Sequence, residues 1–276
     1  MKGRFLAALC AALLGCSAVE PARPVPPPAP TSASPVIDRI LQHGELRVGT
    51  SGNQPPLNAT TKQGQIIGFD ADLAAALAKA MGVKLTLVPI QFSELLPSLE
   101  RGDVDMVLSG LTITPQRNLH VVFVGPYLVS GMSILTKEKT MATLRHAEEI
   151  DTPKVKLAAL RGSTAEKFAQ ENVPRAKLVL TNTLDEGVEL VRKGKVDALL
   201  ADHPFCRVTV YRYRSDHLET LDTPFTFEPL GIALPPNDPL LTNWTQNTLA
   251  DLDDSGAIFE TMSKWFEEDS WVEQLR

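Results

Sequence analysis

The sequence predicts an α/β protein of two lobes, each a mixed sheet flanked by helices, joined by two hinge strands. Three observations lead to this fold class. Short apolar stretches alternate with amphipathic helical stretches along the chain, as they do in α/β domains. One strand-and-helix pattern occurs twice, which indicates two related halves. Two extended, β-rich segments then offer crossings between these halves.

The alternation is clearest in the first half of the chain, where 46–49 predicts a strand. Large apolar residues then recur every four positions, which predicts the buried face of a helix that ends at Gly82. These residues are Phe69, Leu73, Leu77 and Met81. The next elements are expected to be a strand at 84–88, a short helix at 92–99 and a buried strand at 104–108.

The repeated pattern lies at 99–109 and again at 191–201. Each copy has an apolar residue, two polar residues, a glycine, a polar residue, Val-Asp and then an apolar run. Because glycine adopts a left-handed conformation at little cost, Gly102 and Gly194 are expected to end helices directly before strands. Ligands of open α/β sheets gather at the carboxyl ends of strands, so the segments after both strands are expected to face one cleft.

The β-rich segments 129–135 and 227–234 are expected to cross between the lobes. A pair of connecting strands makes a hinge that bends with little change in packing. Apolar residues after Pro239 recur with helical spacing and predict helices that return to the first lobe. The expected division is lobe 1 at 37–130, lobe 2 with the hinge strands at 131–231, and a return to lobe 1 at 232–276.

The N-terminus predicts an export signal. Lys2 and Arg4 precede an apolar run at 5–14 that is too short to span a bilayer, and Cys16 lies two residues after the run. The end of the run resembles the lipobox of bacterial lipoproteins, in which cleavage leaves a cysteine that takes acyl chains such as palmitate. We therefore expect residues 1–15 to be a signal peptide and Cys16 to be lipidated. An ordinary secretory signal with a chance cysteine is the alternative.

Residues 16–36 predict a tether. The stretch consists almost entirely of Pro, Ala, Ser, Val and Thr. It lacks the large apolar groups that would offset the entropy of folding, and its prolines favour extended polyproline geometry. A lipid anchor followed by a semi-stiff spacer would hold the domain beside a membrane without embedding it. We therefore expect a membrane-anchored lipoprotein on the periplasmic side of the cell envelope.

Charge and cysteine use exclude several classes of function. The chain has 27 Lys and Arg against 33 Asp and Glu, a net charge of −6, whereas a nucleic-acid partner requires the opposite sign. Once Cys10 leaves with the signal and Cys16 is acylated, Cys206 is left alone, so no internal disulfide is expected. The five histidines are scattered without metal-ligand spacing, so we expect no metal and no cofactor.

The segment 109–117 carries the most specific chemistry. Gly110 lets a ligand approach backbone N–H groups, Thr112 offers a hydroxyl, and Arg117 supplies a planar guanidinium suited to bidentate binding of a carboxylate. Here the sequence resembles the type-3 extracellular solute-binding proteins, the polar amino-acid receptors of ABC importers. The resemblance covers nearly the whole domain and implies a type II periplasmic-binding fold. It also implies ABC permease subunits as partners, and we expect the receptor itself to be a monomer.

The same resemblance implies roles for individual residues at the carboxylate end of the ligand. Arg117 corresponds to the arginine that clamps the carboxylate. Gly110 and Thr112 correspond to positions that give an N–H group and a hydroxyl to it. Thr164 lies in a segment similar to the family's second anion loop, at a helix start, where its hydroxyl would complete the carboxylate site.

The acid that is implied to bind the ammonium end of the ligand lies on lobe 2. Asp202 corresponds to the acid that receives the α-ammonium, Ser109 to a position that touches the ammonium in some members, and Phe92 to an aromatic wall of the pocket. Each lobe alone would then satisfy only one charge of a zwitterion. Closure is therefore expected to be stabilised only when a ligand bridges both lobes.

The expected side-chain pocket departs from the family pattern. The family usually has an aromatic residue near Gln54 and often an acid near Ser51, and this chain has neither. The expected pocket lining is Ser51, Asn53, Gln54, Phe92 and Leu160. Because no spare carboxylate is visible there, we expect a ligand with a small or uncharged polar side chain. Gln54 lying outside the pocket, in a turn, is the alternative.

Two other functions fit parts of the sequence. The segment 162–169 and the Trp-rich C-terminus are also similar to cyclohexadienyl dehydratases, which share this fold and use a glutamate three residues after the position of Asp202 as general acid. This chain has Phe205 there, which cannot donate a proton, so we expect a protein that is not an enzyme. A ligand-sensing subunit of a signalling system, which would bind the same ligand, is the other alternative.

Overall fold

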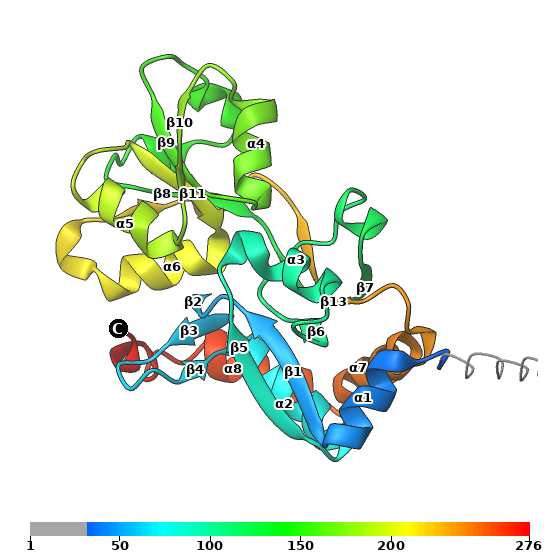
Figure 1. The fold of residues 1–276 in the computed structure, drawn as a ribbon. Coiled ribbons are helices and arrows are strands. Elements are labelled where there is room, and N and C mark those ends of the chain that lie inside the picture. Colours follow the sequence, from blue (N-terminus) through cyan, green and yellow to red (C-terminus); the bar gives the residue numbers. More distant parts are fainter. Residues whose placement is uncertain (1–31) are drawn as a thin grey trace, which may run out of the picture. The chain divides into compact units, whose positions relative to one another are not determined.

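The computed structural model describes residues 32–276 (Figure 1). The expected signal peptide, Cys16 and most of the expected tether lie outside the described residues. No helix within 32–276 is both long and apolar enough to cross a bilayer. The last residues of the expected tether, Pro35 and Val36, begin the first helix, α1 (Pro35–His43), where proline is tolerated because the first N–H groups of a helix have no partner inside it.

Lobe 1 is built on a five-stranded mixed sheet. In sheet order its strands are β5 (Lys84–Pro89), β1 (Glu45–Thr50), β6 (Met106–Val107), β13 (Glu228–Leu234) and β7 (Val122–Ser130). β1 runs parallel to β5 and β6, whereas β13 runs antiparallel to β6 and β7. A small sheet of β2 (Asn53–Gln54), β3 (Asn58–Thr60) and β4 (Ile66–Ile67) accompanies it.

Several helices flank the sheets of lobe 1. Besides α1, they are α2 (Phe69–Met81), α3 (Leu95–Glu100), α7 (Pro239–Asp254) and α8 (Ala257–Phe266). In α2, Phe69 and Leu77 are fully buried, which confirms the predicted buried face. The C-terminal helices contact α2, since the Trp265 indole N–H of α8 donates to the Asp72 carboxylate of α2 at 2.8 Å.

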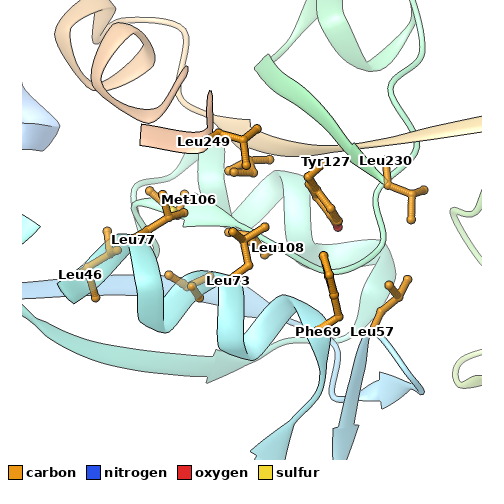
Figure 2. Close-up of a cluster of buried hydrophobic side chains, with 14 of the residues drawn as sticks. Leu46, Leu57, Phe69, Leu73, Leu77, Met106, Leu108, Tyr127, Leu230 and Leu249 are labelled. Atoms are coloured by element: carbon orange, nitrogen blue, oxygen red, sulfur yellow. The ribbon is translucent and has the colours of Figure 1, made fainter. Parts of the chain in front are cut away.

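The core of lobe 1 joins α2 to the sheet and to the C-terminal helices. Figure 2 shows side chains of α2, β1, β6, β7 and β13 meeting there. The Phe69 ring stacks on the Tyr127 ring with 5.8 Å between centroids and meets the Phe266 ring edge-on at 5.9 Å. These contacts fix the start of α2, where the Asp70 carboxylate accepts the N–H of Gly110 at 3.0 Å.

Lobe 2 has a second five-stranded mixed sheet (Figure 1). In sheet order its strands are β10 (Lys177–Thr181), β9 (Lys156–Leu160), β11 (Ala198–Asp202), β8 (Met132–Thr136) and β12 (Glu219–Thr220). Its helices are α4 (Thr164–Asn172), α5 (Leu184–Arg192) and α6 (His203–Arg212). Both five-stranded sheets are mixed and carry helices, so the predicted fold class is confirmed.

The chain crosses between the lobes twice. It first passes from β7 to β8 through Gly131, and it returns through 221–227 into β13. At the crossing the two strands pair antiparallel, with Glu228 opposite Ser130. Lobe 1 therefore contains two separate stretches of chain, whereas lobe 2 is one continuous stretch.

Asp238 caps two helices that are far apart in sequence. One carboxylate oxygen accepts the N–H groups of Val36 and Ile37 at the start of α1, and the other accepts the N–H of Leu241 at the start of α7. Asp238 is 1% exposed, so these N–H groups have no ready access to water. The carboxylate thus satisfies three donors that the helices cannot satisfy internally.

We expect Asp238→Ala to lower the free energy of unfolding by about 2 kcal/mol, because both helix starts lose their cap. Urea denaturation followed by circular dichroism measures this change. The exposed Asp253→Ala in α7 is the matched control and should change stability by less than about 0.5 kcal/mol. Equal stability of the two variants would contradict the capping role.

Candidate functional site

A cleft between the lobes collects most of the predicted ligand-binding residues and contains about 360 Å³ of space between atoms, part of which is open to solvent. Lobe 1 contributes Gln54, Phe92, Gly110, Thr112 and Arg117. Lobe 2 contributes Met132, Leu160, Ser163, Thr164, Ala165, Leu184, Leu200, Ala201 and Asp202. The carboxyl ends of β9 and β11 lie in this lining, as expected for a ligand site in an α/β fold.

Arg117 is held in place by backbone carbonyls of both lobes. It begins a short 3-10 turn after β6. Its Nη1 donates to the Thr112 carbonyl at 2.9 Å, and its Nη2 donates to the Gly162 carbonyl of lobe 2 at 3.1 Å. Burial lowers the pKa of Arg117, while the negative charges of Glu228 and Asp202 raise it. The guanidinium is thus oriented in advance, which suits recognition of a planar anion.

The start of α4 faces Arg117 across the cleft. Ser163 is the N-cap, and its hydroxyl accepts the N–H of Glu166 at 3.2 Å. The N–H groups of Thr164 and Ala165 come directly after the cap and have no partner inside the helix. Both residues line the cleft. A helix start with free N–H groups and the positive end of its dipole favours a carboxylate.

Asp202 ends β11 on the lobe 2 side of the cleft. Its carboxylate accepts a hydrogen bond from the Gln54 side-chain amide of lobe 1 and another from the Ser130 hydroxyl at 3.4 Å. Burial, followed by the negative charge of Glu228, raises the pKa of Asp202 to about 7, against the opposing effect of these two donors and Arg117. Asp202 therefore changes its charge near neutral pH.

The structure divides the predicted pocket residues of segment 51–54. Gln54 lines the cleft as expected, and the alternative that it lies in a turn outside the pocket is wrong. Ser51 and Asn53 do not line it and instead border a separate cavity with Asp185 and Arg212. Successive side chains of a strand point to opposite sides, so Asn53 and Gln54 of β2 cannot both face the ligand.

Ser109 also lies outside the cleft lining. It is fully buried, and its hydroxyl accepts the N–H of Ser51 at 2.9 Å. The Ser51 hydroxyl in turn donates to the Asn58 side chain at 2.8 Å. In this structure Ser51 and Ser109 support the loops behind the cleft. Neither side chain lines the cleft, which differs from the direct ligand contacts expected of both residues.

Gly110 lines the cleft in a left-handed conformation, with φ of 59°. A Cβ there would come within 2.8 Å of the side chains of Gln54 and Leu57, so only glycine fits. Its N–H donates to the Asp70 carboxylate at 3.0 Å and is not directed to a ligand, contrary to expectation. Asp70 also accepts from Asn58 and Tyr127, and burial raises its pKa to about 7.

Phe92 and Leu160 lie in the cleft as expected, with the Arg117 guanidinium carbon 6.0 Å from the centre of the Phe92 ring. Sequence reasoning missed the apolar contributions of Met132, Leu184 and Leu200. These residues come from three different elements of lobe 2, and no local motif marks them. Together they give the cleft a largely apolar wall.

The position at which the resemblance to cyclohexadienyl dehydratases implied a general acid lies outside the cleft. Phe205 occupies it and is 1% exposed, in a core that includes Leu199 and Cys206. The neighbouring His203 begins α6, and its Nδ1 is buried with no partner among the described residues. Burial lowers the pKa of His203, which keeps the imidazole neutral.

Comparison with known protein families gives a match that covers nearly all of the described residues. The model of the bacterial extracellular solute-binding proteins, family 3, matches residues 46–268. The chain belongs to this family. The family resemblance predicted from the segment 109–117 is thereby confirmed.

Curated relatives of this family 3 protein include binding proteins and an enzyme. Cyclohexadienyl dehydratase of Pseudomonas aeruginosa is 29% identical over 231 residues, which are 84% of this chain and 86% of the relative. The L-cystine-binding protein TcyJ of Escherichia coli K12 is 26% identical over the same shares of the two chains.

Solved structures place the family 3 chain in the same fold. A putative binding component of an ABC transporter from Wolinella succinogenes, complexed with lysine, is 39% identical with a TM-score of 0.79. The comparison covers 83% of this chain and 99% of that one. The two-lobed type II periplasmic-binding fold predicted from the sequence is therefore confirmed.

Proposed function

We propose that the protein is a monomeric receptor that binds an amino acid in the cleft and delivers it to the permease subunits of an ABC transporter. The observation that carries this proposal is the placement of Arg117 and Asp202, one from each lobe, in the lining of one cleft. A guanidinium and a carboxylate on facing walls complement the two charges of a zwitterion. Family membership and the binding proteins among its relatives support the same function.

The residues of the cleft suggest how each end of the ligand is bound. Arg117 and the free N–H groups of Thr164 and Ala165 would receive the carboxylate, as charge-assisted hydrogen bonds favour. Asp202 would receive the α-ammonium, and Gln54 would yield or share its bond to Asp202 when that occurs. Because the ligand would contact Arg117 of lobe 1 and both Asp202 and the start of α4 in lobe 2, it would favour the closed arrangement over an open one.

The proposed ligand has a small or uncharged polar side chain. The part of the lining that remains for a side chain is mostly apolar, with Phe92, Met132 and Leu160 among its members. Among the residues that line the cleft, Asp202 is the one acid, and the α-ammonium would use it. An unpaired cationic side chain would therefore lose water without gaining a partner.

The receptor is proposed to work at the cell envelope through an acylated Cys16. The support is the order of a basic start, a short apolar run, this cysteine and a proline-rich stretch. Labelled palmitate should be incorporated into the wild-type protein in cells and not into Cys16→Ser. Incorporation into both proteins, or into neither, would contradict the anchor.

Isothermal titration calorimetry against the twenty amino acids tests the main proposal. We expect one or a few of them to bind with micromolar or tighter affinity and a stoichiometry of one. Binding of none would remove the proposed function. Light scattering during the same titration checks that the protein stays monomeric.

A dehydratase is the second candidate, because one relative at 29% identity is a cyclohexadienyl dehydratase. Phe205 at the general-acid position argues against it. Incubation with prephenate or arogenate distinguishes the two functions. We expect no turnover above that of heat-denatured protein, and measurable turnover would replace the receptor by an enzyme.

A further inference from the structure

Glu228 lies at the junction of the two lobes, directly behind the carboxylate end of the cleft. It begins β13 at the second crossing and is 6% exposed. Its Oε2 accepts the hydroxyl protons of Thr112 from lobe 1 and Thr164 from lobe 2, both at 2.7 Å. Its Oε1 accepts the hydroxyl of Thr226 at 3.3 Å. One buried carboxylate therefore accepts a hydrogen bond from a threonine of each lobe.

These hydrogen bonds change what the two cleft threonines can offer. A hydroxyl has one proton to donate. Because Thr112 and Thr164 give theirs to Glu228, their oxygen atoms present lone pairs to the cleft. Lone pairs repel a ligand carboxylate, which must then rely on Arg117 and on backbone N–H groups. The hydroxyl contacts expected from the family resemblance are consequently unavailable while Glu228 holds these protons.

Glu228 also changes the balance of charge around the ligand. Arg117 is the one Lys or Arg among the residues that line the cleft, and Asp202 is the one acid. When Glu228 is counted with the residues that line the cleft, two carboxylates lie near a single guanidinium. The charge of Glu228 acts on both partners, since it raises the pKa of Asp202 and that of Arg117. A zwitterion leaves this excess of one negative charge unchanged, and a ligand with a second carboxylate increases it.

We propose that Glu228 is a specificity-determining residue that restricts the cleft to ligands with a single carboxylate and excludes those with two. The inference rests on the amino-acid site proposed above and narrows its ligand class. It excludes aspartate and glutamate as ligands, and it also disfavours the dicarboxylates prephenate and arogenate. If the second carboxylate came within about 7 Å of Glu228, Coulomb repulsion at an effective dielectric constant of about 20 would weaken binding by roughly 50-fold.

The test compares the wild type with Glu228→Gln, which keeps the size of the side chain and an acceptor oxygen but removes the charge. Calorimetry at pH 7.5 gives the affinity for the best ligand of the amino-acid screen and for the acidic probes L-glutamate and L-aspartate. Glu138→Gln, an exposed acid of lobe 2, is the matched control. Circular dichroism checks that each variant is folded, and Glu228→Ala serves as a second variant.

In the wild type we expect the acidic probes to bind at least about 50-fold more weakly than the best ligand. Glu228→Gln should reduce that ratio at least about tenfold, while the control leaves it unchanged. Glutamate or aspartate among the tightest wild-type ligands would overturn the proposal, whatever the variants do. An unchanged ratio in a folded Glu228→Gln would also overturn it. Absence of binding by every amino acid is a different result, which removes the receptor function itself.

A second readout separates the charge of Glu228 from a purely structural role. Because this charge helps to raise the pKa of Asp202, its removal should move the midpoint of the pH dependence of ligand affinity to lower pH. A loosened hinge would weaken binding at all pH values and leave the midpoint in place. A midpoint that stays at the wild-type value would contradict the electrostatic role.

Discussion

Arg117→Met is expected to weaken amino-acid binding by about 30- to 4,000-fold, because truncating one partner of a buried charge pair costs about 2–5 kcal/mol. Methionine keeps most of the length of the side chain and loses the guanidinium. The ligand carboxylate would then keep only the N–H groups at the start of α4. Calorimetry with the best ligand of the screen measures the change.

The control for this prediction is Arg161→Met, which removes an exposed arginine just before the same helix start. It should alter affinity by less than about threefold, since an exposed charge interacts weakly in water. The Arg117 variant also loses a link between the lobes, because Nη2 bonds the Gly162 carbonyl. Wild-type affinity in Arg117→Met would show that the carboxylate binds elsewhere and would remove the main support for the receptor.

Ligand affinity is expected to fall by up to about tenfold for each pH unit below about 7, because Asp202 has a pKa of about 7. The α-ammonium requires the ionised carboxylate, which is present above this pH and is lost as the pH falls through it. The ligand carboxylate stays ionised down to about pH 4, so it does not contribute. Affinity at pH 5 should thus be about 100-fold lower than at pH 7.5.

Asp202→Asn provides the control for the pH dependence. The amide is uncharged throughout this range, so the variant should bind weakly and with a flat profile between pH 5 and 7.5. Calorimetry at several pH values in buffers of equal ionic strength gives both curves. A wild-type curve as flat as that of Asp202→Asn would show that Asp202 does not hold the ammonium.

Much of the fold follows from local patterns in the sequence. The apolar spacing from Phe69 to Leu77 marks a helix face whatever it packs against, and the structure buries that face. Gly102 and Gly194 both have positive φ, at 76° and 62°, as their place in the repeated pattern predicts. These features depend on neighbours along the chain, which a sequence displays directly.

The site is less accessible to such reasoning, because its contacts join residues distant in sequence. Resemblance located Arg117 and Asp202, but it could not show that Gln54 would face the cleft while Asn53 turns away. In the sequence, Glu228 belongs to the extended segment 227–234, which predicts a hinge strand and no role in the cleft. A lone acid in an apolar stretch was the available signal, and its meaning depends on Thr112 and Thr164 from the two lobes.

The position of β13 has a consequence for how the chain matures. This strand lies between β6 and β7 in the first sheet, although it follows all of lobe 2 in the sequence. A chain that emerges from its N-terminus therefore presents lobe 2 as a complete unit while the first sheet still lacks an interior strand. Until residue 234 has appeared, the edges of β6 and β7 stay unpaired and open to association with other strands.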